Sequence, residues 1–189
     1  MTLFRTVEPA LEPVTLVEAK THLRVGHDSE DPLISALVRA AREEVERSTG
    51  LALIAQSWRL TLDDWPLSET VAINLHPLAA ILSVTVYGED GEAAVLDPAT
   101  YLLDPHSRPA RLALRERPAP HKAMNGVEID LSAGFGEAGA DVPDLLRRAI
   151  LVLVAHWYEF RGHVDPDAHP LSYPAGYERL ISGYRSRRL

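Results

Sequence analysis

The stretch VPDLLRRAILVLVAHWYEFR, residues 142–161, decides the fold because its apolar pattern predicts a long buried helix. Pro143 suits the first turn, where a backbone N–H would have no partner within the helix. Apolar residues recur at spacings of four and three on one face, which is typical of a packing helix: Leu146, Ile150, Leu153, Trp157 and Phe160. The other faces are also largely apolar between 149 and 155, so we expect the helix to be enclosed by its own domain or by neighbouring subunits. Its unbroken apolar run is shorter than the roughly 20 residues that a bilayer span needs.

Start and stop signals predict further helices on both sides of this one. Thr15 and Glu18 have the spacing of a capping box and begin a helix near 15–25. A second helix is predicted near 31–49, and a short C-terminal helix within 176–189. Along the 31–49 helix, charged side chains are expected to lie mostly away from the apolar stripe: Arg39, Arg42, Glu43, Glu46 and Arg47.

Between these helices the apolar pattern changes to alternation, which indicates strands with one buried face. Strands are predicted at 54–62, 71–75, 81–87, 93–96, 101–103, 111–114 and 127–131. Strands and helices do not alternate along the chain, which argues against a parallel doubly wound sheet. The predicted fold is α+β: a small helical bundle from residues 1–50 and 134–189, with an antiparallel β-rich insertion at 51–133. Residues 1–14 are expected to form an extended arm of the helical part.

The composition excludes several functional classes. The chain has 189 residues, of which 46% are hydrophobic and 24% are charged, as in ordinary globular proteins. Its net charge of −8 argues against an overall electrostatic grip on nucleic acid. It contains no cysteine, so it has no disulfide framework and no thiolate nucleophile. The first 14 residues do not have the apolar core of a signal peptide, and we expect a soluble protein made in the cytoplasm.

A glycine-rich stretch, residues 134–139, matches the G-x-G-x-x-G pattern of dinucleotide-binding proteins. In that fold the helix begins within the glycines, so that its N–H groups meet the pyrophosphate. Here the helix begins after the last glycine, at Val142 and Pro143. We therefore interpret the stretch as a strand-to-helix connection, and no cofactor is predicted.

Residues 163–169 gather two histidines and two aspartates, and His156 and Glu159 lie one helical turn apart just before them. These side chains could ligate zinc or another divalent ion, as in a metal-dependent accessory enzyme built on the region from His156 to His169. A solvated polar loop is the commoner explanation, and no metal is predicted. The chain has no nucleophile elbow, no H-E-x-x-H motif and no P-loop lysine, so no catalytic residue and no enzymatic activity are predicted.

The C-terminal segment is basic in an otherwise acidic chain. It carries Arg179, Arg185, Arg187 and Arg188, interleaved with Tyr173, Tyr177 and Tyr184. Arginine and tyrosine are enriched at protein interfaces. Three interpretations stay open: a solvated terminus, a docking peptide that orders on a partner, or a contact with nucleic-acid phosphates.

The overall pattern resembles the head–tail connector (adaptor) proteins of long-tailed phages, prophages and gene transfer agents, the type with a β-rich insertion. The resemblance rests on five stretches: LVEAKTHLRV, DPLISALVRAAREEVERSTG, LIAQSWRLTLDDWP, LSAGFGEAGADVPDLLRRAILVLVAHWYE and PAGYERLISGYRSRRL. Together they span most of the chain.

This resemblance implies a structural protein in the neck of a virion or phage-like particle. Family members form a ring, typically of twelve copies, between the portal and a stopper or tail-completion protein, and DNA passes through the channel as cargo. The C-terminal segment of such connectors reaches the portal, which makes these residues the expected portal contacts: Tyr177, Arg179, Tyr184, Arg185, Arg187 and Arg188. The alternatives are the metal-dependent enzyme above and a DNA-packaging accessory factor, against which the net charge of −8 argues.

Overall fold

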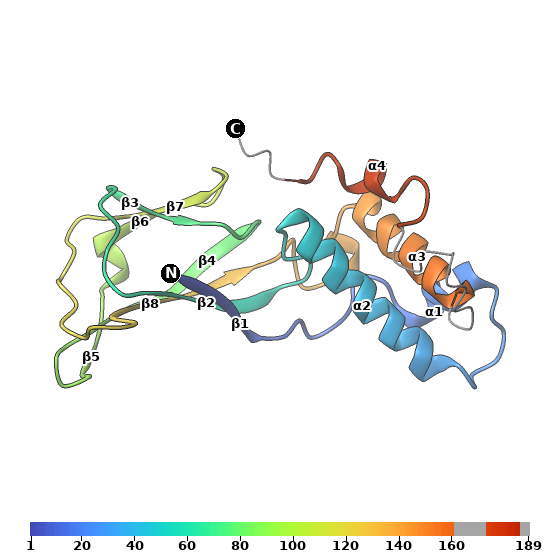
Figure 1. Ribbon diagram of the computed structural model, residues 1–189, viewed down its shortest axis with the longest axis horizontal. Helices are drawn as coiled ribbons and strands as arrows, with labels where there is room; N and C mark the ends of the chain where they lie inside the picture. Colours follow the sequence, from blue (N-terminus) through green and yellow to red (C-terminus); the bar gives the residue numbers. More distant parts are fainter. Residues whose placement is uncertain (161–172, 186–189) are drawn as a thin grey trace, which may run out of the picture. The chain divides into compact units, whose positions relative to one another are not determined.

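The computed structural model describes residues 1–160 and 173–185 of the chain and has the expected α+β fold (Figure 1). The chain forms two compact units. The β unit comprises Met1–Ala10 and Ala55–Phe135, and the helical unit comprises Leu11–Ile54 and Gly136–Leu189. Within the described residues, no helix is long and apolar enough to cross a membrane.

The helical unit contains four helices in its described part: α1 (Leu16–Leu23), α2 (Asp31–Thr49), α3 (Asp144–Glu159) and α4 (Tyr177–Ile181). Local sequence signals set their ends. The Thr15 hydroxyl accepts a hydrogen bond from the Glu18 backbone N–H, and the Glu18 carboxylate accepts one from the Thr15 N–H, which completes the capping box. At the end of α2, Gly50 has φ 71°, a conformation that glycine adopts without strain, and its N–H donates to the Glu46 carbonyl.

The core of the helical unit lies mainly between α2 and α3, which pack side by side, while α4 packs on α3 (Figure 1). On the predicted packing face of α3, Leu146, Ile150 and Leu153 are fully buried. Trp157 is half-buried, and Phe160 is 49% exposed. Phe160 therefore departs from the prediction, because α3 ends at Glu159 and Phe160 is already the C-cap residue.

The β unit consists of two antiparallel sheets. The five-stranded sheet has the order β1-β2-β8-β4-β5, and the three-stranded sheet has the order β3-β7-β6. The strands are β1 (Thr2–Val7), β2 (Gln56–Leu62), β3 (Thr70–Ile73), β4 (Leu78–Tyr87), β5 (Ala93–Val95), β6 (Tyr101–Asp104), β7 (Ala110–Leu114) and β8 (Val127–Ala133).

One face of the five-stranded sheet carries apolar side chains and the other carries polar ones, as the alternating sequence predicts. On the core face, Ile129 of β8 lies between Leu60 of β2 and Val84 of β4, and all three are buried. On the opposite face, the Arg59 Nε donates to an Asp130 oxygen 2.7 Å away. The hydrogen bonds from Arg59 hold the pKa of Asp130 below its ordinary value.

Residues 1–10 belong to the β unit and not to the helical part, to which the whole arm of residues 1–14 was predicted to belong. Residues 2–7 form β1, an edge strand in which Leu3 lies opposite Leu60 of β2. Backbone pairing with β2 and the half-buried Leu3 side chain fix this segment in the β unit. The boundaries between the units therefore fall at Ala10/Leu11 and Ile54/Ala55 as well as at Phe135/Gly136.

Candidate interaction surface

The described part of the C-terminal segment is docked on the helical unit through two stacked tyrosines. The rings of Tyr173 and Tyr177 lie 4.9 Å apart and are nearly parallel. The Tyr173 hydroxyl donates to Glu44 Oε1 at 2.5 Å, and Arg47 Nη2 donates to the Tyr173 hydroxyl at 3.2 Å. Partial burial raises the pKa of Glu44, but hydrogen bonds from Tyr173, Ser48 and Arg47 outweigh it and hold this pKa below its ordinary value.

Tyr177, which was predicted to contact the portal, is part of the core of the helical unit. Its side chain and that of Ile181, one turn later in α4, are 0% exposed. Burial raises the pKa of Tyr177 to about 12. Tyr177 therefore anchors α4, and it offers no surface to a partner while α4 is docked.

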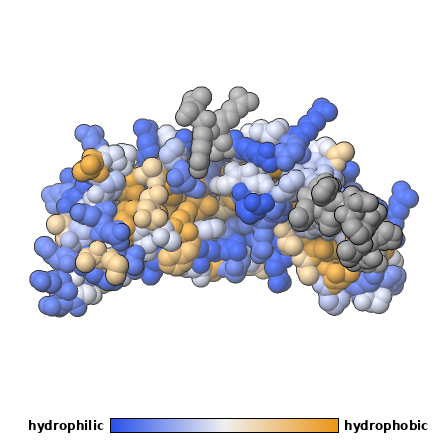
Figure 2. All heavy atoms as spheres, viewed as in Figure 1, coloured by the Kyte–Doolittle hydropathy of each residue, from blue (hydrophilic) through white to orange (hydrophobic). Residues whose placement is uncertain are grey.

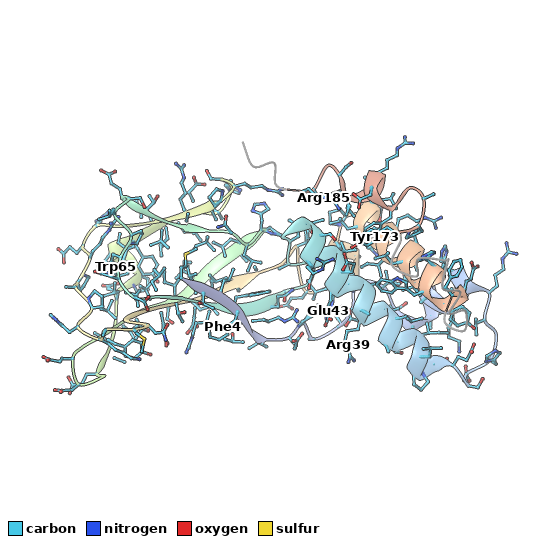
Figure 3. All side chains as sticks on the ribbon, in the orientation of Figure 1. Phe4, Arg39, Glu43, Trp65, Tyr173 and Arg185 are labelled. Carbon is cyan, nitrogen blue, oxygen red and sulfur yellow. The ribbon has the colours of Figure 1, made fainter. Side chains whose placement is uncertain are left out.

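The remaining predicted contacts in the described region are accessible to different degrees. Arg179 and Arg185 are exposed, whereas Tyr184 is half-buried (Arg185 and Tyr173 are labelled in Figure 3). Arg185 forms a two-point ion pair with Glu178, with Nη1–Oε2 at 2.5 Å and Nη2–Oε1 at 3.0 Å. Arg187 and Arg188 lie outside the described residues. Arg179 thus lies on α4, and Tyr184 and Arg185 lie in the turn that follows it.

The helical unit contains a buried arginine that the sequence pattern did not indicate. Arg42 of α2 is 1% exposed, although its position among charged residues suggested an outward face. Its Nε donates to Glu12 and its Nη1 to Glu46, each at 2.8 Å. Glu46 also accepts from the backbone N–H of Leu53 at 2.9 Å, so this network ties three separate segments of the unit together.

The glycine-rich connection serves close packing of the backbone. A Cβ atom at Gly139 would lie 2.7 Å from the Pro13 carbonyl oxygen, and one at Gly136 would overlap the Asp141 carboxylate. Gly134 has φ 142°, which side chains rarely tolerate. These three requirements account for the G-x-G-x-x-G spacing, in agreement with its interpretation as a strand-to-helix connection.

Replacing Gly139 with Ala is expected to destabilise the helical unit by about 1–3 kcal/mol, as overpacking against backbone does. The added methyl group would push Pro13 away and strain the neighbouring contact between Glu12 and Arg42. Urea unfolding followed by far-UV circular dichroism measures the change. Gly26→Ala is the matched control, because a Cβ at Gly26 would meet nothing within 4 Å. Equal stabilities of the two variants would contradict the packing role of Gly139.

The possible metal ligands between His156 and His169 fall largely outside the described residues. Residues 163–169 are not described, and the His156 ring contacts the Phe160 ring, with centroids 4.8 Å apart. In residues 1–160 and 173–185, the structure contains no group of three or more His, Cys, Asp or Glu side chains arranged to hold a metal ion.

Comparison with known proteins identifies relatives of this chain. The family model described as phage gp6-like head-tail connector protein matches residues 13–91. The neck of an empty gene transfer agent particle computed with C6 symmetry contains a chain of 26% identity and TM-score 0.85, and the match covers 100% of this chain and 97% of that one. The virion of a native gene transfer agent particle gives the same identity, coverage and TM-score. The neck of a native particle computed with C12 symmetry gives 26% identity and a TM-score of 0.82 at the same coverage. Comparison with curated proteins finds no match.

Proposed function

We propose that this chain, which matches the head–tail connector family model over residues 13–91 and has the fold of a gene transfer agent neck protein over its whole length, forms a ring adaptor between a portal and a stopper or tail-completion protein. Its role is structural, and DNA crosses the channel of the ring as cargo. The full-length match to chains in sixfold and twelvefold necks is the observation that supports the proposal best. A twelve-copy ring is consistent with both symmetries.

The chemistry of the chain suits such a channel. A net charge of −8 repels the phosphates of a passing duplex and disfavours tight binding. Basic residues are nevertheless concentrated at the C-terminus, where Arg179 and Arg185 are exposed. This end of the helical unit is the proposed contact with the portal, together with Tyr184 and residues 186–189, which include Arg187 and Arg188.

Removing the whole segment from residue 177 onward would not test this contact, because Tyr177 and Ile181 belong to the core. A sharper variant combines Arg179→Glu and Arg185→Glu with deletion of residues 186–189. The helical unit of this variant is expected to keep its stability. The amount of portal protein that co-purifies with the variant is expected to fall at least tenfold. Arg115→Glu, an exposed substitution in the β unit, is the matched control and should retain binding. Undiminished portal binding by the combined variant would contradict the assignment of this surface.

A further inference from the structure

The five-stranded sheet has two edges that no described strand covers. β1 forms one edge. At the other edge, β5 pairs only with residues 85–87 of β4, so that residues 78–83 have a strand partner on one side alone. Exposed edges present unpaired N–H and C=O groups, and proteins usually blunt them with proline, lysine or a covering element. β1, TLFRTV, contains neither proline nor lysine.

Exposed apolar side chains border both edges. Phe4 is 43% exposed and Val7 is 56% exposed on β1, and Leu82 of β4 and Val95 of β5 are 55% and 67% exposed. Figure 2 shows apolar side chains gathered over the region of β1, and Figure 3 labels Phe4 on this strand. Apolar groups along an unpaired edge favour association with another strand over contact with water.

The strand directions decide how two copies can meet. Every neighbouring pair in the order β1-β2-β8-β4-β5 is antiparallel, so β1 runs opposite to β4 and in the same direction as β5. In a twelvefold ring, neighbours differ in orientation by only about 30°, and strand directions are nearly preserved between them. β1 of one copy therefore meets the open half of β4 in the next copy in the antiparallel sense, which is also the sense of every other pairing in the sheet.

We propose that residues 2–6 of one copy pair with residues 78–83 of β4 in the adjacent copy, which joins the β units into a continuous belt. This contact rests on the ring proposed above and names the surfaces that close it. It is heterologous, since it uses two different edges, and it can therefore repeat around a ring. Pairing of β1 with β1 would instead close a dimer and leave both β4 edges open. Because β1 of the next copy takes the place beside β4, each copy adds four strand spacings of about 4.8 Å, and a belt of twelve copies has a circumference of about 230 Å.

Cysteine pairs test this contact directly, because the natural chain contains no cysteine. Phe4→Cys is combined with Leu82→Cys, and particles are purified from cells that produce this double variant. On non-reducing gels, these particles are expected to give a ladder of copies linked by disulfides. Thr2→Cys and Thr6→Cys, each combined with Leu82→Cys, cover the neighbouring registers. Within one copy, β1 and β4 are separated by two strands, about 14 Å in all, which exceeds the reach of a disulfide. Any bond between these positions therefore joins two copies.

Phe4→Cys combined with Leu102→Cys is the matched control, since Leu102 is 63% exposed on β6 of the other sheet, and it should give no ladder. Dimers from Phe4→Cys alone would show β1 paired with β1 and would overturn the proposal. Particles that contain the protein in their necks but give no ladder with any of the three cysteine pairs would also overturn the proposal. Absence of the protein from the particles would overturn the ring itself, and with it this contact.

Discussion

Replacing Arg42 with Ala is expected to lower the free energy of unfolding of the helical unit by about 3–5 kcal/mol, the usual loss when one partner of a buried ion pair is removed. The guanidinium is 1% exposed and neutralises Glu12 and Glu46, of which Glu46 has only 10% of its side chain exposed. Burial disfavours the charged arginine, but the two carboxylates outweigh this effect and raise its pKa above the ordinary value. Without Arg42, both carboxylates would repel each other in a largely desolvated site. Urea unfolding of the purified chain measures the loss.

Arg39→Ala is the matched control for Arg42, because both arginines lie on α2 and pair with Glu12. The side chain of Arg39 is 68% exposed, and its ion pair with Glu12 is long, at 4.0 Å. Exposed ion pairs contribute about 0–1 kcal/mol, so Arg39→Ala should change the stability little. Similar losses from the two variants would show that the buried network does not stabilise the unit as described.

Replacing Tyr177 with Ala is expected to cost about 3–5 kcal/mol, as for other large buried aromatic side chains. The change removes the only fully buried aromatic ring among the described residues and the stacking partner of Tyr173. Undocking of α4 should follow, with loss of the hydrogen bond between Tyr173 and Glu44. Hydrogen exchange monitored by mass spectrometry would then detect faster exchange across residues 173–185.

Tyr177→Phe keeps the ring and should retain most of the stability and the slow exchange. If Tyr177→Ala left both unchanged, Tyr177 would not anchor α4, and its original prediction as a partner contact would regain support. The comparison thus separates a packing role from a recognition role for the same residue.

The parts of the fold that could be predicted from the sequence depend on local signals. The Thr15 capping box, the glycine that ends α2 and the apolar face of α3 act within a few residues, and the corresponding helices form. β1 could not be recognised in this way, since a six-residue edge strand depends on pairing with residues 50 or more positions away. The order of the strands in the sheets is equally a non-local property.

The misjudged side chains have a similar explanation. Arg42 was expected on the outer side of α2, but its partner Glu12 lies 30 positions earlier in a segment without regular structure. Tyr177 was grouped with the surface tyrosines because composition alone does not reveal that a five-residue helix folds back on the bundle. Only spatial neighbours distinguish a tyrosine that anchors a segment from one that contacts a partner. For Arg179 and Arg185, by contrast, a basic terminus indicated exposed residues, and both are exposed.

Electron microscopy of particles from cells that produce a tagged copy tests the central claim most directly. The proposed function predicts density for the tag as a ring at the neck, between head and tail, with twelvefold or sixfold symmetry. Particles whose necks carry no tag, although the tagged chain is folded and present in the cells, would contradict it.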